Sequence, residues 1–104
     1  MLLFHLALPE DWDAACRAGE YRVSTRGLTL EQVGFIHGAH PHQVAGVRAR
    51  FYADVPELLL LHIDTDRLTS PWREDPVPDS PEKFPHVYGP VNLDAVVAVE
   101  HLGD

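Results

Sequence analysis

Cysteine is nearly absent from this sequence, because Cys16 is the only one in 104 residues. A single cysteine excludes an intramolecular disulfide and a cysteine-rich zinc site assembled within the chain. The lack of disulfides is typical of a reducing compartment, so we expect a cytoplasmic protein. Cys16 itself is expected on the core-facing side of a helix, where it would not serve as a nucleophile.

Long apolar runs are also missing, and none approaches the roughly 20 residues that span a bilayer. The apolar opening at residues 1–4 has no preceding basic residue, and His5 and Pro9 interrupt it before a signal sequence would be complete. We therefore expect a chain that is neither exported nor associated with a membrane. Its length and its 45% hydrophobic residues suit one domain with one core, residues 1–104.

Basic residues are scarce: eight stand against sixteen acidic ones, for a formal net charge of −8. Such a charge opposes the phosphate contacts that supply most non-specific affinity for nucleic acid. We therefore expect no large nucleic acid as a partner. A small anionic, nucleotide-like ligand remains compatible with this charge, because it needs only a local group of donors.

The pattern of apolar runs and turn residues predicts an α+β domain with short strands and two main helices. Strands are expected at residues 2–8, 33–37, 58–63, 84–88 and 95–102, and helices at residues 9–18 and 41–51. The apolar run at 58–63 is typical of a central strand covered on both faces. Residues 21–30 are predicted to form a polar flap, and residues 69–85, with five of the nine prolines, a surface loop.

The second predicted helix is expected to place Val44, Val47 and Phe51 on its inner face. Gly46 lies in the middle of this helix, where glycine costs roughly 1 kcal/mol relative to alanine. We expect that this glycine allows a neighbouring element to pack closely against the helix.

Histidine is abundant, with seven in 104 residues. Four of them lie in or at the end of a predicted strand: His5, His37, His62 and His86. Such a position combines a fixed ring with access to a cleft, and the reference pKa near 6.5 suits hydrogen bonding or proton transfer at neutral pH. The alternative for each ring is a core histidine that is hydrogen-bonded to a backbone carbonyl.

His37, His40 and His42 form the pattern H-x-x-H-x-H, which raises the hypothesis of a metal-dependent hydrolase, because imidazole is a good ligand for zinc, nickel and copper. Pro41 separates two of the rings, and no nearby carboxylate or cysteine completes a tetrahedral set. We therefore expect an exposed helix start at His40 and His42, and no structural metal. No serine-nucleophile elbow, G-x-G-x-x-G or Walker A pattern occurs either.

Four segments together resemble one family: FHLALPEDWDAACRAGEYR, GFIHGAHPHQVAGVRARFY, LLLLHID and FPHVYGPVNLDAVVAV. In this order they are similar to the small bacterial domain of unknown function numbered 952, and the resemblance spans nearly the whole chain. GFIH and FPHVYGP are its most specific parts. That family is similar in fold to the ADP-ribosyltransferases and, within them, to the histidine-rich group that includes the RNA 2′-phosphotransferases.

The resemblance implies a pocket for NAD as a substrate, or for an ADP-ribose-like nucleotide, with ADP-ribosyl or phosphate transfer as its chemistry. His5 matches the position that holds the nicotinamide ribose, and His37 the position that flanks the nicotinamide. A third position falls at Phe84 or Glu82, with His86 close by. The implied catalytic residues are thus His5, His37 and His86, and the implied ligand contacts are Arg22, Arg26, Phe35, Phe84 and Tyr88.

Two further expectations follow from this resemblance. His5 and His37 should lie on adjacent strands and face one cleft, and phosphate contacts should come from arginines among Arg22, Arg26, Arg48 and Arg50, although we expect Arg50 to lie on the surface. If Phe84 holds the third position, the site has no carboxylate beside the sugar. A non-enzymatic module that senses a ligand or docks onto a partner protein is then the alternative function.

Overall fold

The strand β6 (Glu57–Asp64) lies at the centre of the main sheet, as its apolar run predicts. In the computed structural model, which describes residues 1–78 and 80–103, β6 pairs antiparallel with β1 (Leu2–Ala7) and with β10 (Val96–Gly103). Alternate side chains of a strand point to opposite faces. Leu61 and Ile63 therefore enter one hydrophobic core, and Leu58 and Leu60 enter a second core on the other face.

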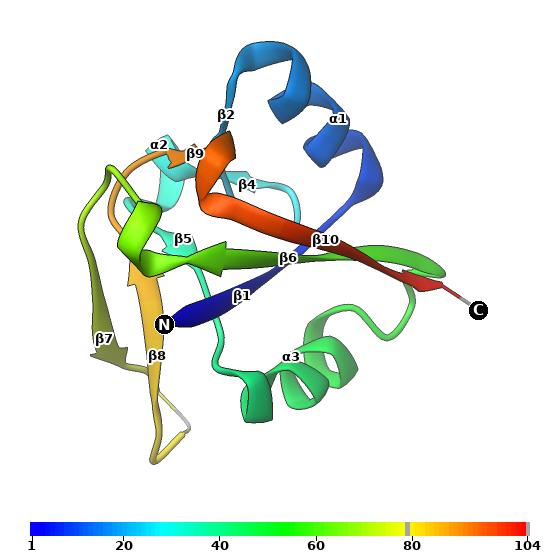
Figure 1. Ribbon diagram of the computed structural model, residues 1–104. Helices are drawn as coiled ribbons and strands as arrows, with labels where there is room; N and C mark the ends of the chain where they lie inside the picture. Colours follow the sequence, from blue (N-terminus) through cyan, green and yellow to red (C-terminus); the bar gives the residue numbers. More distant parts are fainter. Residues whose placement is uncertain (79, 104) are drawn as a thin grey trace.

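Helix α1 (Pro9–Ala18) and helix α3 (Val44–Phe51) lie on opposite sides of this sheet (Figure 1). Proline in the first turn and two acidic residues near the amino end favour the start of α1 at Pro9. Gly19 ends it in a left-handed conformation, with φ at 91°, and donates its N–H to the carbonyl of Ala15. The prediction that Cys16 faces the core is wrong: Cys16 is exposed, and Ala15 is the residue that α1 buries.

Helix α3 follows a short 3₁₀ turn, η1 (Pro41–Gln43), and packs Val44 and Val47 against the second core, as predicted. The prediction for Phe51 is wrong, because 55% of this residue is exposed. Tyr52, only 3% exposed, takes its place in the core. Tyr52 follows the last residue of α3 and has φ at −132°, so helical spacing from Val44 does not set its direction.

Residues 20–33 form regular structure, so the predicted flap is wrong. They contain β2 (Glu20–Tyr21), the hairpin of β3 (Val23–Thr25) with β4 (Leu28–Thr29), and the short helix α2 (Leu30–Val33). A capping box between Thr29 and Gln32 fixes the start of α2. The strand predicted at residues 33–37 is therefore reduced to β5 (Ile36–His37).

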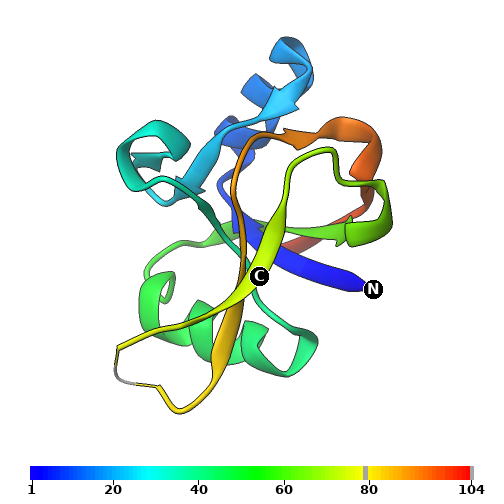
Figure 2. The ribbon, with the colours of Figure 1, turned by 90° about the vertical axis from the view of Figure 1, so that its left-hand side faces the viewer.

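A second three-stranded sheet has the order β5-β8-β7, with β8 (Lys83–Val87) at its centre and β7 (Trp72–Pro76) at its edge. The prediction of a loop over residues 69–85 is wrong, because most of its prolines flank the two strands instead of interrupting them. Pro71 precedes β7, Pro76 ends it, and others lie in the connection to β8. Figures 1 and 2 show this hairpin reaching past the main sheet on the side of α3.

The remaining elements connect these sheets: η2 (Thr65–Arg67), η3 (Leu93–Ala95), and β9 (Val91–Asn92), which pairs with β2. Among the described residues, no helix is long and apolar enough to cross a membrane.

Two glycines provide a matched test of packing. A Cβ added at Gly38 would lie 2.7 Å from the carbonyl oxygen of Pro85, which the Gly38 N–H approaches at 2.9 Å, and 3.1 Å from a methyl of Leu3. A Cβ at Gly46 would meet nothing within 4 Å, so the expected close packing at Gly46 is wrong.

We predict that Gly38→Ala lowers the free energy of unfolding by roughly 1–3 kcal/mol through overpacking. Gly46→Ala should raise it by roughly 0.5–1 kcal/mol.

Urea denaturation followed by circular dichroism measures both variants against the wild type. Equal effects of the two substitutions would contradict the close approach of residue 38 to strand β8.

Candidate functional site

A cavity of about 500 Å³ lies where the main sheet, α3 and the β7–β8 hairpin meet. This volume is within the roughly 300–1,000 Å³ typical of small-molecule sites. Its aromatic lining comes from β1, the segment before β5, the end of α3, and β8: Phe4, Phe35, Phe51, Tyr52 and Phe84. The polar lining includes three histidines, His5, His37 and His86. The fold thus brings together at one cavity the three histidines that the sequence singled out.

The described residues that line this cavity include one arginine. Arg50 borders it, whereas none of the described residues that line it is an aspartate or glutamate. The chain as a whole has a formal net charge of −8. Among the charged side chains that the structure describes, Arg50 is thus the one that borders this cavity. Arg50 is exposed, as expected, and it also borders this cavity.

His37 and His86 are direct partners across the antiparallel pair of β5 and β8. Cross-strand partners project from the same face of a sheet, and the centroids of these two rings lie 5.5 Å apart. Phe35 stacks on His86 with a centroid distance of 4.1 Å and contacts His37 at 5.0 Å. The opposite face of the sheet packs Ile36 and Val87 into the core, which fixes the orientation of the histidine face.

A carboxylate orients the ring of His86. The Nδ1 of His86 lies 2.9 Å from an oxygen of Asp75, and the hydroxyl of Tyr88 donates to the same oxygen. These hydrogen bonds, that of Tyr88 first, hold the pKa of Asp75 below its usual range. An ionised Asp75 accepts a hydrogen bond from Nδ1–H, so the lone pair of neutral His86 lies on Nε2. This Nε2 has no hydrogen-bond partner among the described residues.

Arg73 completes the surroundings of Asp75. Its guanidinium lies 4.3 Å from the centre of the Tyr88 ring, and its Nε is 3.0 Å from the second oxygen of Asp75. Tyr88 therefore contributes to the site through Asp75 and through its contact with Phe35, at 5.5 Å between centroids.

A serine orients the ring of His37. The hydroxyl of Ser24 donates to the carbonyl of Phe35 at 2.5 Å, so its oxygen is left to accept from Nδ1–H of His37 at 3.0 Å. The carbonyl of Ser24 lies 3.2 Å from the same nitrogen. Partial burial, and to a smaller degree nearby His86, lower the pKa of His37. His37 is thus neutral near pH 7, with its lone pair on Nε2.

His5 is a buried ring with both nitrogens in use. Its Nδ1 donates to the carbonyl of His37 at 2.5 Å, and its Nε2 accepts from the hydroxyl of Tyr21 at 2.9 Å. Burial lowers the pKa of His5 to about 4, and burial also raises the pKa of Tyr21. This geometry corresponds to the core histidine named above as the alternative. A catalytic role for His5 stays a prediction, and proton transfer by this ring would first require one of its hydrogen bonds to open.

His5 and His37 belong to different sheets, so the expectation of adjacent strands is wrong. The two strands approach each other instead through an isolated bridge between Phe4 and Ala39. Both histidines nevertheless border one cavity.

The arginines expected to bind phosphate lie elsewhere. Arg22 is paired with Glu20 and Glu31, and Arg26 makes two hydrogen bonds to Asp54, at 2.7 and 2.8 Å. Neither borders the cavity, and Arg48 donates to the carbonyl of Leu102. Ligand contacts by Arg22 and Arg26 would need these carboxylates to be displaced, and Arg50 is the arginine that the fold brings to the cavity.

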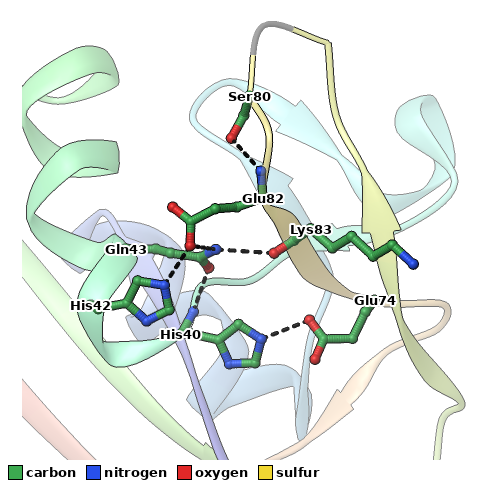
Figure 3. Close-up of polar contacts among 7 residues, drawn as sticks. All are labelled: His40, His42, Gln43, Glu74, Ser80, Glu82 and Lys83. Atoms are coloured by element: carbon green, nitrogen blue, oxygen red, sulfur yellow. Dashed lines mark hydrogen bonds and ion pairs between the residues drawn. The ribbon is translucent and has the colours of Figure 1, made fainter.

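Of the two candidates for the third position, Phe84 borders the cavity and Glu82 does not. Glu82 accepts a hydrogen bond from His42 at 2.5 Å, and His40 is hydrogen-bonded to Glu74 at 2.7 Å; Figure 3 marks both contacts. The bond from His42 lowers the pKa of Glu82. These two pairs, with the amide of Gln43 donating to the carbonyl of Lys83, join the start of α3 to the β7–β8 hairpin.

His37 lies apart from this cluster, with Ser24 and His86 as its neighbours, so the three histidines of the H-x-x-H-x-H pattern do not converge. Within residues 1–78 and 80–103, no group of three or more histidine, cysteine, aspartate or glutamate side chains is arranged to hold a metal ion.

Three residues of the site have no counterpart in the sequence-based prediction: Tyr21, Ser24 and Asp75. Tyr21 and Ser24 fall in the segment expected to be a flap, and Asp75 in the segment expected to be a loop. If residues 72–76 had been predicted as a strand, Arg73 and Asp75 would have been placed on the same face, because they are two positions apart. No signal in the sequence marks Ser24.

The comparisons with known proteins establish the family of this chain. The model of the family described as "Protein of unknown function (DUF952)" matches residues 6–99. The chain belongs to this family. No curated protein matches the chain.

Two solved structures share the fold of this DUF952 chain. The crystal structure of protein CC0527 from Caulobacter crescentus has a TM-score of 0.85 at 24% sequence identity, and covers 98% of this chain and 86% of that one. A double mutant of the same protein has a TM-score of 0.84 at 22% identity, with the same coverage. At these identities the comparison establishes the fold and leaves the activity to the site itself.

The buried His5 predicts a pH dependence of stability. Its pKa is about 4 in the folded protein, against about 6.5 for an exposed histidine, so between these values the unfolded chain binds a proton that the folded one does not. The free energy of unfolding should therefore fall as the pH falls through this range, by roughly 3 kcal/mol from this group.

Urea denaturation of the wild type and of His5→Gln at a series of pH values isolates this contribution. The variant should be less stable at pH 7 and should have a flatter dependence below it. Parallel curves for the two proteins would contradict a neutral His5 in the folded state.

Proposed function

We propose that the cavity binds a small anionic ligand with a flat ring, of the class of NAD, ADP-ribose or their mononucleotide parts. The observation that carries this proposal is the combination at one cavity of aromatic walls, imidazole rings and Arg50 without a described carboxylate. An apolar lining with a few polar groups at one end is typical of a ligand site. The local charge selects an anion despite the acidic chain.

The geometry supports a specific orientation of such a ligand. Phe84 and Phe51 offer flat apolar surfaces for a ring, and Nε2 of His37 offers a hydrogen-bond acceptor to its polar edge. Arg50 lies at the end of α3, where it can pair with a phosphate. Because Arg22 and Arg26 do not border the cavity, we propose that it holds one nucleotide unit and that the rest of a dinucleotide lies outside it.

The resemblance to ADP-ribosyltransferase-like domains supports the choice of ligand, because His37 matches the position that flanks the nicotinamide there. It gives less support to ADP-ribosyl transfer. That reaction builds positive charge on the sugar carbon, which a neighbouring carboxylate stabilises. Since Glu82 is hydrogen-bonded to His42 away from the cavity, we propose ligand binding as the function and attach no ADP-ribosyl transfer to it.

Calorimetric titration with NAD, ADP-ribose and nicotinamide tests this proposal. We predict that His37→Ala weakens binding roughly 5- to 150-fold, because one hydrogen bond and ring packing worth about 1–3 kcal/mol are lost. Arg50→Ala should weaken binding of the two phosphate-bearing ligands by roughly 10- to 150-fold but leave nicotinamide unaffected.

Arg22→Ala is the matched control, since it removes an arginine that does not border the cavity. It should bind like the wild type, and circular dichroism should show that all three variants are folded. If the wild type gives neither heat nor thermal stabilisation with any of these ligands, the nucleotide proposal fails, and docking of a partner protein becomes the leading function.

A further inference from the structure

The rings of His37 and His86 make similar hydrogen bonds but lie in different electrostatic surroundings. In each ring a hydrogen bond fixes Nδ1, to Ser24 in one case and to Asp75 in the other. In each, Nε2 has no partner among the described residues, and both rings border the cavity. Two imidazoles 5.5 Å apart, each held by a hydrogen bond at Nδ1, are a suitable arrangement for moving protons at one substrate.

The difference between the two partners assigns the roles. The hydroxyl and the carbonyl of Ser24 carry no charge that would stabilise a protonated ring. His37 therefore stays neutral near pH 7, and its Nε2 can act as a base. Asp75 is an ionised carboxylate that accepts from Nδ1–H of His86, so its negative charge lies beside the ring that we assign as the proton donor. Environments that separate two titratable groups in this way identify acid and base in an active site.

The cationic and imidazole groups at the cavity indicate the class of reaction. Arg50 and an imidazolium stabilise negative charge, which develops on the non-bridging oxygens when a phosphate is attacked. An acid–base pair supplies no nucleophile, so it suits a substrate that carries its own, such as a ribose 2′-hydroxyl next to a phosphodiester. The cavity of about 500 Å³ and the net charge of −8 favour a dinucleotide over a long RNA.

We propose that His37 and His86 form a metal-independent acid–base pair that cleaves small ribonucleoside phosphodiesters. Nε2 of His37 takes the proton of the 2′-hydroxyl, and the 2′-oxygen forms a bond to phosphorus. The bond from phosphorus to the 5′-oxygen breaks, and Nε2–H of His86 gives its proton to that oxygen. The products are a nucleoside 2′,3′-cyclic phosphate and a nucleoside with a free 5′-hydroxyl. This proposal rests on the proposed binding of a nucleotide-class anion in the cavity.

The pH dependence of this reaction depends on every ionisable group near the two rings. His86 faces Asp75 on β7 and His37 on β5, with Arg73 and Tyr88 around Asp75. His37 also lies near His5, whose own ring is neutral above about pH 4. A base and an acid acting together give a bell-shaped rate profile.

The experiment uses the full chain with the dinucleoside monophosphates UpA and ApA in excess EDTA, and separates the products by chromatography. We expect cyclic phosphate and nucleoside in equal amounts, with a bell-shaped dependence on pH between about 5 and about 9. His37→Ala should lower kcat roughly 10²- to 10⁴-fold, as expected for loss of a general base.

Asp75→Asn tests the acid without removing the buried ring of His86. Without the negative charge beside Nδ1 the ring is a poorer proton donor, so kcat should fall roughly 10²-fold while KM changes little. His101→Ala, an exposed histidine on β10 that does not border the cavity, is the matched control and should reproduce the wild-type profile.

Three results would overturn the inference. One is nucleotide binding by titration without cleavage of either dinucleotide, which leaves the proposed function intact. Another is cleavage that His37→Ala does not slow, which identifies a contaminating nuclease. The third is cleavage abolished by EDTA, which makes the reaction metal-dependent. Absence of both cleavage and binding would refute the proposed function as well.

Discussion

The two hydrogen bonds of the buried His5 hold the parts of this structure together. Its ring donates to the carbonyl of His37 in β5 and accepts from the hydroxyl of Tyr21 in β2, while its own backbone pairs with the central strand β6. Three sheets thus meet at one side chain that is 4% exposed. Because a buried polar group without a partner costs about 1–3 kcal/mol, the three elements are constrained to one arrangement. That arrangement sets the position of His37 at the cavity.

The second sheet separates structural and chemical residues onto its two faces. Ile36 and Val87 pack into the core on one side, and His37, His86 and Asp75 lie on the other. Packing of the apolar face fixes the backbone of the sheet. The rings on the polar face are therefore held in position before any ligand binds. This division explains how so short a strand as β5, only two residues long, can place a side chain reliably. Preorganisation of this kind lowers the entropic cost of binding.

The hairpin of β7 and β8 closes the cavity on its outer side, and polar pairs hold it to the start of α3. His40 with Glu74, and His42 with Glu82, connect segments more than thirty residues apart. In the sequence, His40 and His42 were candidates for metal binding and Glu82 was a candidate for the third site position; in the structure all three join two elements. Their use in joining two elements leaves the cavity to His37, His86 and Arg50. The CC0527 protein shares this fold at 24% identity, so the arrangement of elements does not require close similarity of sequence.

Local physics in the sequence determined much of the fold. The apolar run of β6 required cover on both faces, Pro9 and Gly19 set the ends of α1, and the α+β class followed from the order of these segments. The three histidines of the cavity were also identifiable, because their positions in or beside strands follow from the sequence. Tertiary structure alone decided which partner each ring received. Asp75, Ser24 and Tyr21 meet these rings through contacts between residues 11 to 16 positions apart, which no local pattern encodes. Tertiary structure also decided that Arg50 borders the cavity and that Arg22, Arg26 and Glu82 pair elsewhere.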